Sequence, residues 1–321
     1  MTMTQTIQKK QNIMHFLKNN ISFAAFIFLF IMFSFSSNGK FLTVSNLLSV
    51  SGSSVDLLIC ALGATFIIML GSIDLSAGSM ISLCGVFAAK TYNATHSTWA
   101  ALAAAIAVGL VFYAIMGFAH TKLQVPTFIV SLGFLSIARA SVTMVSSGTI
   151  TMIPFESTFK KFLGLKPWLL IIGLAAFAIA WLIERYTLFG RYTRLIGGDE
   201  TVARLSGINV NKQKMMVFLF AGVFTALAGV VMAARIGSGS PSVGQGYELN
   251  VISAVVLGGT SQRGGIGGVR GTLIGALTLG MLSNGLVLWG MPSEVQLFIK
   301  GIVLILAVYV SLERKRNMVI K

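Results

Sequence analysis

Ten apolar runs, most of them long enough to cross a lipid bilayer, dominate this sequence. A spanning helix needs about 20 predominantly apolar residues. The runs occupy residues 21–36, 53–70, 76–90, 99–119, 126–146, 167–184, 214–234, 247–259, 271–289 and 294–311. The third and the eighth are short and interrupted by glycine. The sequence therefore predicts an all-α polytopic membrane protein with about ten transmembrane helices, within a range of eight to ten.

The scarcity of charge excludes a water-soluble enzyme. Charged residues make up 10% of the chain, whereas a soluble domain carries about 25%. The net charge of +15 does not indicate nucleic-acid binding, because lysine and arginine gather in the cytoplasmic loops of membrane proteins. Cys60 and Cys84 lie in apolar runs and are expected to be buried free thiols. The sequence shows no cluster of metal ligands, no catalytic set and no phosphate-binding GxxxxGK[ST] motif, so we expect no cofactor.

The distribution of basic residues predicts the topology. With both termini in the cytoplasm, sixteen of the 24 Lys and Arg residues lie inside and six lie outside. The cluster of Lys160, Lys161 and Lys166 opposes this arrangement. We predict a cytoplasmic tail at 1–20, an uncleaved first helix, one membrane domain at 21–311, a cytoplasmic loop at 185–214 and a cytoplasmic tail at 312–321.

Two segments echo each other. Residues 62–85 and 253–276 both run from an apolar stretch through glycine and a polar turn into a small-residue helix. Transporters are often built from inverted repeats with broken helices at the midplane. An inverted repeat is therefore one interpretation, and shared packing chemistry is the other.

Asp74 lies between two apolar runs, in the motif GSIDLSAGS. An acidic side chain within the hydrocarbon region is costly and usually marks a pathway or a buried partner. Alternatively, Asp74 caps the following helix by accepting amide protons from Ser76 or Ala77. Asp56, Arg139, Glu248 and Lys300 are further candidate intramembrane charges, and Asp56 with Arg139 is one conceivable pair. The glycine pairs 264/268, 267/271 and 271/275 predict close helix packing.

The stretch GGDETVARLSGIN at 197–209 predicts a short helix of about 10 Å on the cytoplasmic side. Asp199 suits the N-cap position, and Glu200 adds negative charge in the first turn. Gly207 suits the left-handed position after the helix. Val202, Ala203 and Leu205 are expected to supply an apolar side.

Four segments, in this order, closely resemble the membrane permease subunits of bacterial ribose-type ABC importers. They are GSIDLSAGS, GRYTRLIGGDETVARLSGINV, ISAVVLGGTS and GGVRGTLIGAL, and the similarity extends from about residue 40 to 310. The resemblance implies the ABC importer permease fold. It also implies the bacterial inner membrane, a monosaccharide such as ribose, allose or xylose, and four kinds of partner: an ATP-binding cassette subunit, a periplasmic sugar-binding protein, a second permease chain of the same or a related kind, and membrane lipid.

In that family the short cytoplasmic helix couples the permease to the ATPase, and residues 199–203 are similar to its EAA-like loop. The resemblance assigns coupling contacts to Gly198, Asp199, Glu200, Ala203, Arg204, Ser206, Gly207 and Ile208. A neutral sugar needs a route lined by hydroxyl and amide groups. The candidates for this route are Asp74, Ser76, Ser79, Ser131 and Asn284.

An ion-coupled secondary sugar transporter that works alone is the alternative. Its coupling acids would be Asp56 and Asp74. The docking-like helix at 197–209 opposes this alternative, because a carrier does not need it. A membrane-embedded enzyme is excluded by the lack of a clustered catalytic set.

Overall fold

The computed structural model describes residues 21–37 and 39–318. The helices are α2 (Ile21–Ser36), α3 (Val44–Ser53), α4 (Val55–Met69), α5 (Ala77–Thr95), α6 (Thr98–Thr121), α7 (Thr127–Ser146), α8 (Thr158–Leu163), α9 (Trp168–Tyr186), α10 (Leu188–Gly198), α11 (Glu200–Leu205), α12 (Val210–Ile236), α13 (Tyr247–Leu257), α14 (Val269–Leu288) and α15 (Ser293–Met318). The two-residue strands β1 (Thr151–Met152) and β2 (Ser238–Gly239) pair antiparallel. The described part is therefore all-α apart from this one pairing.

Each of the ten predicted apolar runs forms a helix, namely α2, α4, α5, α6, α7, α9, α12, α13, α14 and α15. Within the described residues, six helical stretches are long and apolar enough to cross a membrane: Val44–Met69, Thr98–Thr121, Thr127–Ser146, Trp168–Tyr186, Val210–Ile236 and Val269–Leu288. Helices α2 and α13 are apolar but shorter. The predicted tail at 1–20 lies outside the described residues, and α15 extends to Met318 into the predicted tail at 312–321.

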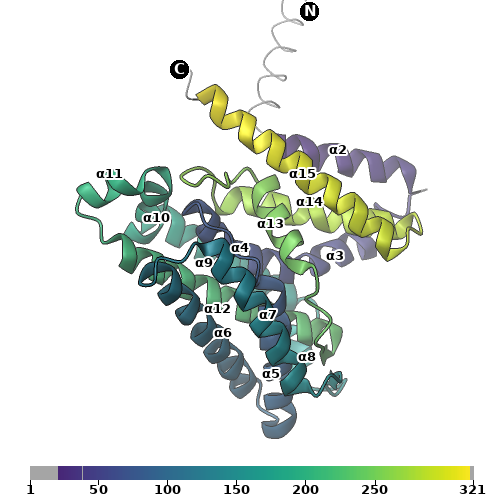
Figure 1. The fold of residues 1–321 in the computed structure, drawn as a ribbon. Helices are drawn as coiled ribbons and strands as arrows, with labels where there is room; N and C mark the ends of the chain where they lie inside the picture. The colour runs from purple at the N-terminus through teal and green to yellow at the C-terminus, as the bar shows by residue number, and fades with distance from the viewer. Residues whose placement is uncertain (1–20, 38, 319–321) are drawn as a thin grey trace, which may run out of the picture.

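Helix α4 forms the centre of the molecule, and every residue from Val55 to Met69 is buried. Helices α12, α9, α13 and α14 pack against it. Figure 1 shows α6, α7 and α12 below α4, with α6 packed against both α7 and α12, α2, α14 and α15 above α4, and α11 projecting at one end. The buried core thus follows the helices that the sequence makes apolar on all sides.

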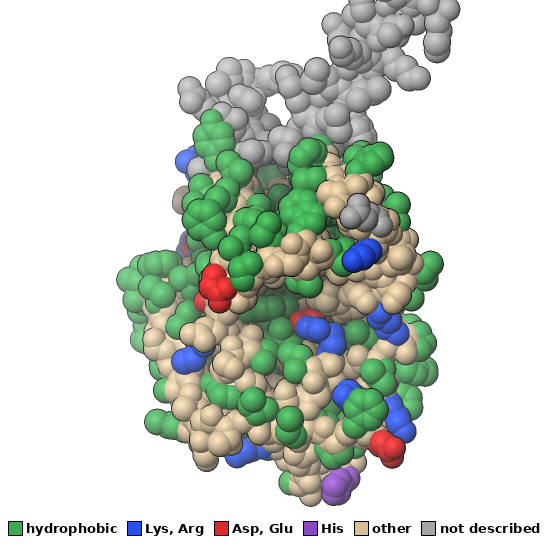
Figure 2. Space-filling model, turned by 90° about the vertical axis from the view of Figure 1, so that its right-hand side faces the viewer, with side chains coloured by type: hydrophobic (Ala, Val, Ile, Leu, Met, Phe, Trp, Pro, Cys, Tyr) green, Lys and Arg blue, Asp and Glu red, His purple; other side chains and the backbone are tan. Residues whose placement is uncertain are grey.

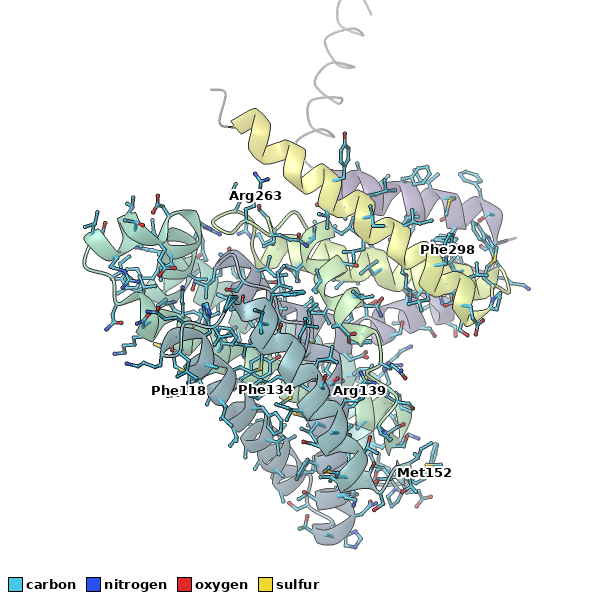
Figure 3. All side chains as sticks on the ribbon, in the orientation of Figure 1. Phe118, Phe134, Arg139, Met152, Arg263 and Phe298 are labelled. Atoms are coloured by element: carbon cyan, nitrogen blue, oxygen red, sulfur yellow. The ribbon has the colours of Figure 1, made fainter. Side chains whose placement is uncertain are left out.

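The outer helices expose apolar side chains. Phe118 on α6 and Phe298 on α15 are exposed and lie on the outer side of the ribbon (Figure 3), and α7 and α9 expose further isoleucine and leucine side chains. Figure 2 shows one face of the molecule, on which apolar side chains are spread over the surface among fewer charged groups and a hollow lies near the middle. Such a surface suits a lipid environment.

The two echoed segments form helix–break–helix units that lie side by side. The break after α4 spans residues 70–76, and the break after α13 spans residues 258–268. Tyr247 at the start of α13 bonds to Asp56 at the start of α4, and the Gly265 amide after α13 donates to the Met69 carbonyl at the end of α4 (2.9 Å). Helices α4 and α13 therefore run parallel, so the echoed segments are not an inverted pair.

The predicted small-residue packing occurs at one of the three glycine pairs. Gly264, Gly267 and Gly268 have positive φ angles and lie in the break before α14, because the hydrogen bonds there form turns and not helix. Gly271 and Gly275 lie on α14 and face α13, where an added Cβ would meet the carbonyls of Gly258 and Ala254. The pairs 264/268 and 267/271 are therefore not helix-packing faces.

This contact predicts a stability difference between two Gly→Ala variants. Gly271→Ala forces α13 and α14 apart and is expected to lower the free energy of unfolding by about 2 kcal/mol. Gly133→Ala on α7 has open space around the new methyl group and is expected to raise it by up to about 1 kcal/mol. Unfolding of the purified chain in mixed micelles measures both. Equal stability of the two variants would contradict the close contact.

Candidate functional site

Helix α11 begins with a side-chain cap. The Asp199 carboxylate accepts hydrogen bonds from the amides of Thr201 (2.9 Å) and Val202 (3.0 Å). These bonds satisfy two amides that a helix start leaves without intrahelical partners. The N-cap predicted for Asp199 is confirmed.

The end of α11 is equally well defined. The Gly207 amide donates to the Arg204 carbonyl (3.1 Å), and the Ile208 amide donates to the Ala203 carbonyl (3.2 Å). This is the Schellman pattern, which requires a left-handed residue directly after the cap. Gly207 has a φ of 79°, so the position predicted for it is also confirmed. Both ends of this six-residue helix are therefore fixed locally.

Ion pairs attach α11 to the membrane bundle. Glu200 accepts from Lys214 on α12 (2.7 Å) and from Arg204 one turn along α11 (2.9 Å). The Lys214 hydrogen bond and the two nearby positive charges hold the pKa of the Glu200 carboxyl below its ordinary value. Glu200 thus anchors α11 to the long helix α12.

The apolar residues of α11 face two directions, which differs from the expected single apolar side. Ala203 is buried against the chain itself, whereas Val202 and Leu205 are 57% and 83% exposed. Successive helical residues are 100° apart, so Leu205 lies near Val202 and almost opposite Ala203. Val202 and Leu205 therefore form an exposed apolar surface on α11, on a different side from Ala203.

The remaining predicted coupling residues surround this surface. Gly198, Asp199, Arg204, Ser206 and Gly207 are exposed, and Ile208 is half-buried. A cavity of about 350 Å³ beside α11 is lined by Arg194, Leu195, Gly198, Asp199, Val202, Ala203, Ser206, Ile208 and Gly265. The projecting helix and the adjacent cavity give this end of the molecule a shape that suits a docked partner.

Four of the five predicted route residues gather at the break between α4 and α5. Asp74 is buried, and its carboxylate accepts from the Ser76 amide (2.8 Å), the Ser76 hydroxyl (2.6 Å) and the Tyr113 hydroxyl (2.5 Å). The Ser131 hydroxyl donates to the Ile73 carbonyl (3.3 Å). Asp74 accepts from the Ser76 amide as expected, although the N-cap position itself is Ser76. The Asp74 carboxylate therefore ties the break to α6.

The neighbouring charges also have partners within the bundle. Arg139 on α7 donates from Nε to the Ser79 hydroxyl (3.2 Å). Asp56 pairs with Arg235 at the end of α12 (3.1 Å) and accepts from Tyr247 on α13 (3.1 Å). The conceivable pair of Asp56 with Arg139 is wrong, because Asp56 lies at the start of α4 and faces the end of α12 and the start of α13.

Asn284 lies elsewhere, at the opposite end of the bundle from α11. Its amide group exchanges two hydrogen bonds with that of Asn46 (2.9 and 3.0 Å). It lines a cavity of about 740 Å³ together with Ser49, Gly52, Ser53, Gly164, Leu165, Lys166, Leu169, Arg235, Ser283 and Val287. This outer cavity is lined by serine, asparagine and basic groups as well as by glycine and apolar side chains, and Arg235 connects it to the buried Asp56.

The described residues contain no group of His, Cys, Asp or Glu side chains suited to a metal ion. Cys60 and Cys84 are buried and free, as expected. The arrangement therefore consists of a projecting capped helix at one end, a closed polar break in the middle and a cavity lined in part by polar groups at the other end. Such an arrangement suits a membrane transport protein.

Comparison with known proteins identifies this class. The family described as "Branched-chain amino acid transport system / permease component" matches residues 46–308, and the chain belongs to this family. It is thus a multi-pass membrane protein and the permease component of a transport system. No solved structure gives a significant match.

Relatives of this chain include sugar permeases. The ribose import permease protein RbsC of Escherichia coli K12 is 39% identical over 280 residues, covering 85% of this chain and 87% of the relative. RbsC of Bacillus subtilis is 37% identical over 98% of this chain and 99% of the relative. The L-arabinose transport system permease protein AraH of E. coli K12 is 36% identical over 77% of this chain and 76% of the relative.

Proposed function

We propose that this chain is the membrane permease subunit of an ABC importer that carries a monosaccharide such as ribose, allose or xylose across the bacterial inner membrane. The observation that carries the proposal is the match to ribose permeases along nearly the whole chain. The family description names branched-chain amino acids, but the relatives named for sugars favour a sugar here. The serine and asparagine groups of the outer cavity suit its hydroxyl groups.

The proposed arrangement has ten transmembrane helices and both termini in the cytoplasm. Residues 185–214 then form the cytoplasmic loop, and the outer cavity faces the periplasm. Residues 1–20 and 312–321 are the cytoplasmic tails of a membrane domain at 21–311. The distribution of basic residues supports this orientation, because sixteen of the 24 Lys and Arg residues then lie on the cytoplasmic side and six on the periplasmic side.

Energy enters through α11. We propose that an ATP-binding subunit docks on Val202 and Leu205, with Gly198, Asp199, Arg204, Ser206, Gly207 and Ile208 around them. Closure of the ATPase pair presses α11, and the Glu200–Lys214 pair passes the movement to α12. ATP supplies the shift by its differential affinity for two arrangements of the ATPase pair. A periplasmic binding protein delivers the sugar, and a second permease chain completes the route.

The route is closed in the present arrangement. Asp74, Ser76, Ser79 and Ser131 are at most 5% exposed, so a sugar reaches them only after the helices around the break separate. Separation of α6 from the break exposes the Asp74 carboxylate that Tyr113 now covers. Asp74 thus positions the break in the closed state.

Reconstitution tests this function against the ion-coupled alternative. Proteoliposomes with this chain, its ATPase and its binding protein are expected to accumulate labelled sugar with ATP, and vesicles with this chain alone are not. Asp74→Asn keeps an oxygen for Ser76 and is expected to lower uptake only a few-fold, because Asp74 positions the break. Gradient-driven flux through the chain alone, abolished by Asp74→Asn, would overturn the proposal.

A further inference from the structure

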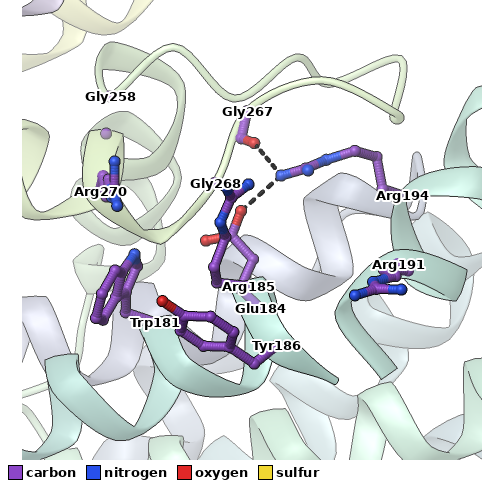
Figure 4. Close-up of a pocket in the computed structure, with 11 residues that line it drawn as sticks. Trp181, Glu184, Arg185, Tyr186, Arg191, Arg194, Gly258, Gly267, Gly268 and Arg270 are labelled. Carbon is purple, nitrogen blue, oxygen red and sulfur yellow. Dashed lines mark hydrogen bonds and ion pairs between the residues drawn. The ribbon is translucent and has the colours of Figure 1, made fainter. Parts of the chain in front are cut away.

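A second cavity lies near the α11 end of the molecule and has no part in the proposed coupling. It has a volume of about 690 Å³. Its lining residues come from α9, from α10, from the break at 258–268 and from the first turn of α14. Figure 4 shows the charged and aromatic side chains of its wall: Trp181, Glu184, Arg185, Tyr186, Arg191, Arg194 and Arg270. Arg194 lines both this cavity and the one beside α11.

The lining carries a surplus of positive charge. It contains four guanidinium groups and one carboxylate, that of Glu184. Glu184 is already paired with Arg194 (2.6 Å) and accepts from the Val269 amide (2.8 Å). Among the described residues, no side-chain hydrogen bond or ion pair involves the guanidinium group of Arg185 or of Arg191, and both residues are exposed. Two arginines therefore face this space with their donors unused.

Aromatic side chains form the rest of the wall. The rings of Trp181 and Tyr186 meet edge to face with centroids 6.0 Å apart, and the Arg270 guanidinium lies 5.1 Å from the Trp181 ring. Further along α9, Leu174 and Ile179 are exposed. Tryptophan and tyrosine favour the boundary between lipid tails and headgroups. The cavity therefore lies where the apolar surface of α9 gives way to basic side chains.

We propose that this cavity binds the phosphate group of an anionic phospholipid in the inner leaflet. Arginine binds phosphate through paired, charge-assisted hydrogen bonds, and basic pockets between membrane helices on the cytoplasmic side suit acidic headgroups. The acyl chains would then lie along the apolar surface of α9. The bound lipid would bridge α9, α10 and α14. The inference rests on the proposed cytoplasmic placement of residues 185–214.

Lipid binding to the purified full-length chain tests this proposal. The chain in neutral detergent is titrated with phosphatidylglycerol, with phosphatidylcholine or with soluble glycerol 1-phosphate, and adducts are counted by native mass spectrometry. Phosphatidylglycerol is expected to bind preferentially. Arg185→Gln combined with Arg191→Gln should weaken this binding about thirtyfold, because two phosphate-facing charges are lost.

A matched variant controls for net charge. Lys122→Gln combined with Arg263→Gln removes the same charge from exposed positions outside the cavity, and Figure 3 shows Arg263 on the segment between α13 and α14. This variant is expected to bind phosphatidylglycerol like the parent. Equal weakening in both variants, or equal binding of phosphatidylcholine or glycerol 1-phosphate, would overturn the proposal.

An acidic surface of the ATPase subunit is the competing occupant. If Arg185→Gln with Arg191→Gln released the ATPase subunit but left phosphatidylglycerol binding unchanged, the lipid proposal would be wrong. The lipid measurement uses neither ATP nor sugar. Its failure would therefore leave the proposed transport function standing, and failure of the transport assay would not affect the lipid result.

Discussion

Leu205→Glu is expected to reduce ATP-driven uptake to the background level while the protein stays folded in the membrane. Leu205 is 83% exposed on α11, so its replacement leaves the interior of the chain unchanged. In the proposed complex it contacts the ATP-binding subunit together with Val202. A charge introduced into an apolar contact is left buried without a partner, and loss of a central contact residue weakens docking by about thirtyfold or more. Uptake by proteoliposomes and co-purification of the ATPase subunit measure the effect.

Two controls accompany this variant. Leu205→Met keeps an apolar side chain of similar volume and is expected to retain most of the uptake. Leu205→Cys is expected to react with a membrane-impermeant maleimide in inside-out vesicles and not in intact spheroplasts. Uptake near the parent level by Leu205→Glu, or labelling of Leu205→Cys from the periplasm, would contradict the proposed docking surface.

The positions of the helices could be predicted from the sequence because each depends on local properties. Apolar runs of sufficient length form helices wherever the chain is in lipid, and all ten runs do so. The two ends of α11 could also be predicted from the sequence, because Asp199 and Gly207 act through their own backbone neighbours. Helices α3, α8 and α10 were missed, because α3 is rich in serine, α8 has only six residues, and the amphipathic α10 lies in the polar interval 185–214.

Contacts between distant segments could not be predicted. The partner of Asp56 is 179 positions away, on α12, and no spacing rule links them. The grouping of the candidate route residues depends on such distant contacts too. The side chains of Asp74, Ser76, Ser79 and Ser131 meet because α5, α6 and α7 pack around one break. Asn284 lies apart from them, at the outer cavity. Helical geometry alone places Val202 and Leu205 on a different side of α11 from Ala203. It does not show which of the two sides faces the bundle.

Asp56→Ala is expected to cause the largest loss of stability, because it removes the shared acceptor of two other helices. The Asp56 side chain is 1% exposed and accepts from Arg235 and Tyr247. Without it, the Arg235 charge and the Tyr247 hydroxyl remain without their partner. Loss of one partner from a buried ion pair costs about 3–5 kcal/mol. Since the Arg235 side chain is 30% exposed, water compensates part of this, and we expect about 3 kcal/mol.

A double-mutant comparison separates the pair from simple loss of packing. Arg235→Ala in the Asp56→Ala background removes the unpaired charge, so the double variant should be less destabilised than the sum of the two single variants. Glu156→Ala removes an exposed acid of the loop before α8 and should change stability by less than about 0.5 kcal/mol. Unfolding in mixed micelles measures all four variants. If the single losses add without interaction, Asp56 and Arg235 act independently, and α4 and α12 are held together at this end by apolar packing alone.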